Sequence, residues 1–99
     1  MKRLRLTPEA ELDLDVAHLW YQRKAPRVAA DFLAAINARL SSIRRQPEAY
    51  PLIDATTRRA LIRRFPYAVF YEIASAEIVV YAVLHCARDP RAWRRRRDG

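Results

Sequence analysis

The spacing of apolar residues in this chain changes once, and that change limits the fold more than any other feature of the sequence. Between residues 8 and 46 the apolar residues recur every three or four positions, as in helices. From residue 58 they come in short runs rich in β-branched and aromatic residues, as in strands. Because 99 residues have room for one core, we predict a single α+β domain, with residues 1–86 as its core and residues 87–99 as a basic C-terminal segment.

The predicted order of elements is β-α-α-β-β-β. Residues 2–6 alternate basic and apolar side chains like a half-buried strand, and Thr7-Pro8 marks the start of a helix that ends near residue 25. A second helix over residues 26–46 follows so closely that the two must form an antiparallel hairpin. We expect this helical hairpin to pack on a mainly antiparallel, twisted sheet.

The sheet is predicted from the last part of the chain. Residues 58–65, 67–73 and 77–85 form an antiparallel meander, and the last of these strands is central because both of its faces are apolar.

The sequence predicts that one segment of the chain faces the core and that another faces the solvent. The first helix carries one apolar stripe, which we expect to face the core. Its members are Leu12, Val16, Leu19 and Trp20. Near the C-terminus, Trp93 is expected to dock on the domain, with residues 94–97 projecting from it as a run of solvated arginines.

Scarce residue types exclude several classes of function. The one glycine is Gly99, so a phosphate-binding loop or dinucleotide fingerprint cannot form. Cys86 is the single cysteine, and with His18 and His85 it falls short of a four-ligand zinc site. We therefore expect no cofactor and no metal. The lone cysteine, with the lack of an export signal or an apolar run of 18 residues, indicates the cytoplasm and no membrane contact.

The net charge of the chain indicates what kind of partner it binds. The chain carries +8, and residues 58–99 account for +6 of it, almost all from arginine. Such a surface favours a polyanion or an acidic protein. The arginines around residues 58–64 and the tyrosines that follow are typical of nucleic-acid binding, but equally of a sheet with tyrosines in its core. His85 is either an acid–base residue or a histidine that holds the strand end by a hydrogen bond.

Two motifs carry a resemblance to a known family. They are Arg58-Arg59-(x)5-Phe65-Pro66-Tyr67-(x)3-Tyr71 and Val83-Leu84-His85-Cys86-Ala87-Arg88-Asp89-Pro90-(x)2-Trp93. With the order of elements, they make essentially the whole chain resemble the ParE branch of the RelE/ParE toxin superfamily. The resemblance implies the toxin of a type II toxin–antitoxin module, or plasmid stabilisation protein, held inactive in a hetero-oligomer by an acidic ParD-like antitoxin that folds on binding.

The resemblance also implies a target. ParE-type toxins are associated with inhibition of DNA gyrase, whereas RelE-type toxins cleave mRNA on the ribosome with a third-strand arginine and often a late tyrosine. Ala68 and Trp93 stand at those two positions here. We therefore expect a growth-inhibiting gyrase inhibitor that is not itself an enzyme. The alternatives are a RelE-type endoribonuclease, in which His85, Arg88 and Arg59 would be catalytic, a toxin fold that only binds, or a small nucleic-acid-binding domain.

The residues expected to bind the target or the antitoxin share a basic or aromatic character. They are Arg59, Arg63, Tyr67, His85, Arg88, Trp93, Arg94 and Arg95.

Overall fold

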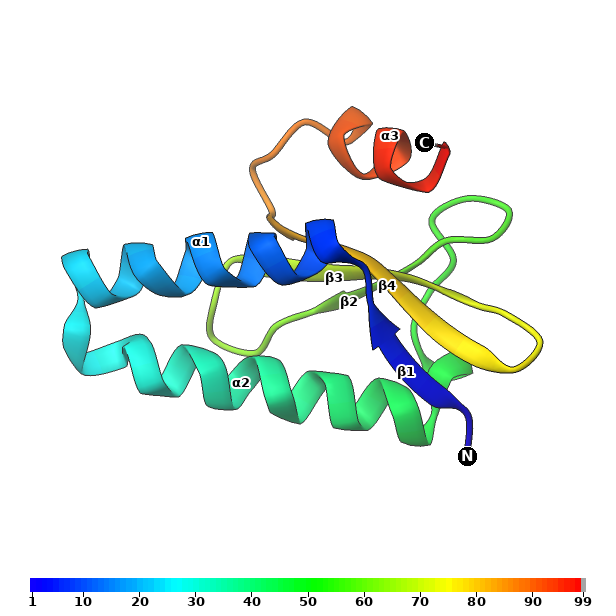
Figure 1. Ribbon diagram of the computed structural model, residues 1–99, viewed down its shortest axis with the longest axis horizontal. Coiled ribbons are helices and arrows are strands. Elements are labelled where there is room, and N and C mark those ends of the chain that lie inside the picture. The colour runs from blue at the N-terminus through cyan, green and yellow to red at the C-terminus, as the bar shows by residue number, and fades with distance from the viewer. Residues whose placement is uncertain (99) are drawn as a thin grey trace.

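The computed structural model describes residues 1–98 and confirms the predicted α+β architecture (Figure 1). Its elements are β1 (Arg3–Leu6), α1 (Pro8–Lys24), α2 (Pro26–Arg45), the short 3-10 turn η1 (Pro47–Ala49), β2 (Arg58–Leu61), β3 (Tyr67–Ile73), β4 (Glu77–His85) and α3 (Arg91–Asp98). The strands form one sheet in the order β1-β4-β3-β2. β1 runs parallel to β4, and the other neighbours are antiparallel, so the meander and its central last strand are as predicted.

The helical hairpin follows from local signals. The Thr7 hydroxyl accepts the Ala10 N–H at 3.2 Å, and Pro8 occupies the first turn, where its missing N–H costs nothing. Only Ala25 separates α1 from α2, and Pro26 starts the second helix. α2 buries Phe32, Ile36 and other apolar residues against the sheet, which forms the main core.

The apolar stripe of α1 does not face the core, and this prediction was wrong. Leu12 and Val16 are each 61% exposed and Trp20 is 53% exposed, whereas Ala17 and Tyr21 are buried. The helix is rotated so that small alanines face the sheet. Their size lets the backbone of α1 approach the backbone of the sheet closely. Helical spacing alone shows that a stripe exists, but it does not tell whether the chain's own core covers it.

A bulge in β4 adds Tyr81 to a second core on the outer face of the sheet. Phe70 pairs with Ala82 and Tyr71 pairs with Val80, so the ladder skips Tyr81. Tyr81 and Ala82 therefore both belong to the outer core. The Tyr81 hydroxyl forms a buried hydrogen bond with the Thr57 hydroxyl, and burial raises the pKa of Tyr81 to about 12.

β2 is shorter than the predicted strand over residues 58–65. It ends at Leu61, and the chain then turns through Arg64, whose φ of 73° is left-handed. Beyond that turn Phe65 packs edge-on against Tyr21 and Phe32, with ring centroids 5.4 Å apart in both pairs. The aromatic contacts thus anchor the β2–β3 turn to both helices.

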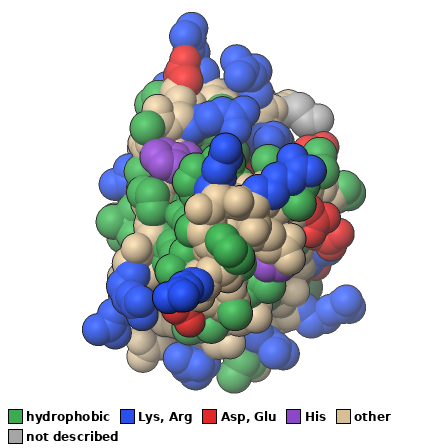
Figure 2. Space-filling model, turned by 90° about the vertical axis from the view of Figure 1, so that its left-hand side faces the viewer, with side chains coloured by type: hydrophobic (Ala, Val, Ile, Leu, Met, Phe, Trp, Pro, Cys, Tyr) green, Lys and Arg blue, Asp and Glu red, His purple; other side chains and the backbone are tan. Residues whose placement is uncertain are grey.

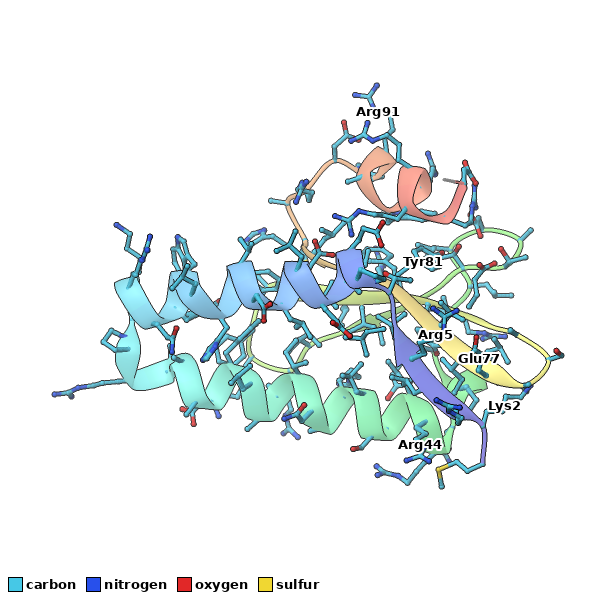
Figure 3. All side chains as sticks on the ribbon, in the orientation of Figure 1. Lys2, Arg5, Arg44, Glu77, Tyr81 and Arg91 are labelled. Carbon is cyan, nitrogen blue, oxygen red and sulfur yellow. The ribbon has the colours of Figure 1, made fainter. Side chains whose placement is uncertain are left out.

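Most of the basic C-terminal segment forms the helix α3, Arg91–Asp98, rather than a projecting tail. Trp93 docks as predicted, stacked on Phe70 with ring centroids 5.6 Å apart and planes 11° from parallel. α3 thereby covers the face of the sheet opposite the helical hairpin (Figure 1). Arg91 extends outward from the start of this helix (Figure 3).

Two arginines of the predicted solvated run point inward instead. Arg96 donates to both oxygens of Asp13, at 2.8 and 3.0 Å, and the same carboxylate accepts the Val83 N–H at 3.0 Å. Arg97 forms an ion pair with Asp54. Of residues 94–97, only Arg94 and Arg95 remain exposed.

Replacement of Arg96 by alanine should destabilise the fold. The Asp13 side chain is only 10% exposed, so Arg96→Ala leaves a largely buried carboxylate without its cation, and we expect a loss of about 2–3 kcal/mol in the free energy of unfolding. Urea denaturation measures this loss. The matched control Arg95→Ala removes an exposed arginine and should change stability by less than about 0.5 kcal/mol. Equal effects of the two substitutions would contradict the assignment.

Asp54 should make stability depend on pH in the acid range. Burial alone would raise the pKa of Asp54, but hydrogen bonds from the Thr57 and Thr56 amides and the charge of Arg97 outweigh it, so the pKa is lowered. A lowered folded pKa stabilises the fold above the unfolded value of about 3.9, and this stabilisation is lost as the pH falls through the folded pKa. Asp54→Asn should therefore reduce stability at neutral pH and lose its effect in strong acid. Thermal denaturation against pH tests this, with the exposed Asp15→Asn as the control; a deficit that persists in acid would contradict it.

Candidate interaction site

The exposed stripe of α1 forms one wall of an apolar groove of about 520 Å³. We call it the α1 groove; its walls are Leu12, Val16, Trp20, Tyr21, Pro66, Tyr67, Val83 and Leu84, and its polar lining is Asp13, His85, Arg88 and Arg96. Figure 2 looks onto the end of the molecule where α1 meets α2, and it shows hydrophobic side chains gathered on one side with Lys and Arg around them. The groove thus joins an apolar interior to a rim on which Arg88 is, within residues 1–98, the uncompensated charge, because Arg96 is paired with Asp13.

Aromatic packing holds the inner end of the groove in place. The Tyr67 ring lies 5.3 Å from Phe32 and 6.3 Å from Tyr21, and the His85 ring meets Tyr67 edge-on at 5.2 Å. Burial raises the pKa of Tyr67, with a further contribution from Tyr21, and burial also raises the pKa of Tyr21. Both phenols therefore stay neutral at physiological pH and serve as packing surfaces.

A second, smaller hollow of about 230 Å³ lies on the outer face of the sheet beside α3. We call it the basic hollow. Its apolar lining includes Ala68, Phe70, Leu84 and Trp93, and its basic lining is Arg59, His85, Arg88 and Arg94. β2 brings Arg59 there because Arg59 pairs directly with Phe70 across the strands, and paired residues share one face.

His85 separates the two hollows and lines both of them. Its Nδ1 accepts the Ala87 N–H at 3.0 Å, which leaves Nε2 of the neutral ring as a hydrogen-bond donor. A ring held in this way can present Nε2–H to a ligand, while its Nδ1 is engaged by the backbone. The geometry therefore favours binding over general-base chemistry.

The structure brings most of the predicted site residues together. Arg59, His85, Arg88, Trp93 and Arg94 all line the basic hollow, and Tyr67 joins His85 and Arg88 in the α1 groove.

Two predicted residues lie outside these hollows. Arg95 lies beside Arg88 on an adjoining surface, and Arg63 is separate, on the α2 side of the molecule. The groove wall formed by the α1 stripe was missed as a site, although its spacing was visible, because it was assigned to the core.

Two further features of the part of the chain that the structure describes concern metal ions and membranes. Within residues 1–98, no group of three His, Cys, Asp or Glu side chains is placed to hold a metal ion. None of the helices in this range has the length and apolar character needed to cross a membrane.

Fold and site together define a small basic α+β domain with a helical hairpin on one face of the sheet, a short C-terminal helix on the other and an open apolar groove. The profile of the ParE toxin of the type II toxin–antitoxin system parDE matches residues 4–90. The chain belongs to this family of toxins.

A solved structure has the same fold. The chromosomal ParDE toxin–antitoxin system from P. aeruginosa contains a chain that superimposes with a TM-score of 0.76, at 19% sequence identity, over 86% of this chain and 96% of that one. No curated protein matches the sequence.

Proposed function

We propose that this ParE-family toxin inhibits DNA gyrase and is neutralised by an acidic antitoxin whose apolar segment occupies the α1 groove. The observation that carries the antitoxin part is the exposed stripe of α1 beside the guanidinium group of Arg88, which is unpaired within residues 1–98. Exposed apolar stripes of this kind mark interaction surfaces, and within the fold these side chains remain largely exposed.

An acidic segment that folds on binding fits this surface. Covering Leu12, Val16 and Trp20 would contribute about 1.5–3 kcal/mol for each side chain that becomes fully buried. Large aromatic residues such as Trp20 are common centres of binding energy at interfaces. Carboxylates of the partner would meet Arg88 and His85 on the rim and give the encounter its speed and orientation.

Gyrase is proposed as the target because the features needed for RNA cleavage are lacking at the expected positions. Ala68 is buried in the lining of the basic hollow, where the ribonuclease branch of the superfamily has an arginine. Trp93 stands in place of the late tyrosine, and its ring is held against Phe70. We place the module in the cytoplasm, where gyrase acts and where the exposed Cys86 would stay reduced.

Polar substitutions in the α1 stripe should abolish tight antitoxin binding without unfolding the toxin. The double variant Leu12→Ser/Val16→Ser loses apolar area worth about 3 kcal/mol at the interface, so we expect affinity to fall by roughly a hundredfold. Calorimetry with the cognate antitoxin gives the affinity, and thermal denaturation gives the stability. Leu61→Ser is the matched control, since Leu61 is 55% exposed and lies outside the groove. Unchanged affinity of the double variant would place the antitoxin elsewhere.

The purified toxin should inhibit gyrase supercoiling and leave mRNA intact. Loss of one preorganised charge-stabilising group costs catalysis roughly a hundredfold or more, and Ala68 cannot replace an arginine. A supercoiling assay and a translation extract test the two activities side by side. Codon-specific cleavage that His85→Ala or Arg88→Ala abolishes would instead establish a ribonuclease. Normal growth at full induction without the antitoxin would contradict toxicity itself.

A further inference from the structure

We infer that the basic hollow binds single-stranded nucleic acid, with a phosphodiester between its arginines and a base against its apolar lining, and that it does so without cleaving the strand. The inference does not rest on gyrase as the target.

The first observation is the state of the arginines. The side chains of Arg59, Arg88 and Arg94 are exposed, and among residues 1–98 no hydrogen bond or ion pair engages their guanidinium groups. Half of the other arginines are occupied by the protein itself: Arg5 pairs with Glu77, as Figure 3 shows, and Arg96 pairs with Asp13. Three guanidinium groups with free hydrogen-bond donors around one hollow make it a site for an anion.

The one carboxylate in the lining does not cancel this charge. Asp89 forms an ion pair with Arg91 at 2.7 Å and also accepts the Arg91 N–H at 2.9 Å. The side-chain hydrogen bond from Arg91 is the main reason that the pKa of Asp89 is lowered to about 2. Asp89 is therefore committed to the start of α3, and the hollow keeps its positive charge.

The second observation is the shape and lining of the hollow. A volume of about 230 Å³ has room for one base with its phosphate. It is too small to accept a helix, which is about 10 Å across. Leu84, Phe70 and Ala68 form an apolar floor to the hollow beside the arginines. Planar guanidinium forks match phosphate oxygens, and a nucleic-acid strand places an anion beside a flat ring at every nucleotide.

An acidic protein segment fits the hollow less well. Its carboxylates stand at the ends of flexible stems and bring no flat ring with them, and its apolar side chains would find the larger α1 groove. Trp93 is stacked on Phe70 and has the Arg94 guanidinium 5.2 Å from its ring centre, so its faces are already covered. Contact with the ring edge and the apolar lining would tolerate any base, so we expect little sequence preference.

Binding without cleavage follows from the groups present. His85 Nδ1 is engaged by the Ala87 amide, so the imidazole cannot act as a base unless that contact breaks. Ala68 adds no charge to the lining. The three arginines can hold a phosphate, but nothing beside them activates an attacking oxygen.

Fluorescence anisotropy of the full-length toxin with labelled single-stranded DNA or RNA of about 12 nucleotides tests the inference. Arg59→Gln and Arg94→Gln, which lie outside the α1 groove, should each weaken binding roughly tenfold or more and lower the slope of log affinity against log salt by about one. Arg27→Gln is the matched control, because it removes the same charge from an exposed position on α2 and should have little effect. Gel analysis after incubation should show the oligonucleotide intact.

Several outcomes would overturn the inference. They are no binding of either strand, equal weakening by Arg27→Gln, displacement by polyglutamate at equal charge, or cleavage of the oligonucleotide. Gyrase inhibition is measured separately with the same variants. Nucleic-acid binding without gyrase inhibition would defeat the proposed target and leave this inference standing, and the reverse result would defeat only this inference.

Discussion

The carboxylate of Asp13 joins three elements that lie far apart in the sequence. β1 pairs with β4 only as far as Val80, so in the described part of the chain no strand meets the β4 edge at Val83. Asp13 accepts the Val83 N–H there and binds Arg96 from α3 with both oxygens. These contacts fix α1 beside the strand edge. With Asp13 turned toward β4, the apolar stripe of α1 is left facing outward, and the groove follows from that rotation.

The same contacts determine whether the basic hollow exists. α3 supplies Trp93 and Arg94 to that hollow, but the helix is short and rich in charge, so it has little tendency to stay folded by itself. Stacking on Phe70 and the inward ion pairs of Arg96 and Arg97 hold it against the sheet. Arginines that look alike in the sequence thus divide into two roles: some position the helix, and others face the solvent with their hydrogen-bond donors free.

Sequence reasoning succeeded where the signal was local. Thr7-Pro8, Ala25-Pro26 and the doubly apolar last strand fixed the helical hairpin and the centre of the sheet, and the motifs brought most of the site residues to one region. It failed where the outcome depends on distant partners. The rotation of α1 and the folding of α3 both need the Asp13–Arg96 pair, whose members are 83 residues apart. The early end of β2 goes with a left-handed conformation at Arg64. The sequence has no glycine there that would have indicated such a turn.

His85 and Arg88 line both hollows, and this shared wall has a consequence for control of the toxin. If an acidic partner fills the α1 groove, its carboxylates meet Arg88 and reduce the positive potential of the basic hollow on the other side. Charges separated by less than a Debye length of about 8 Å interact strongly, so the effect crosses the wall without any change of shape. An antitoxin bound only in the groove would then weaken anion binding at a surface that it leaves uncovered. Neutralisation by charge and neutralisation by coverage are distinguishable, because only the first weakens at high salt.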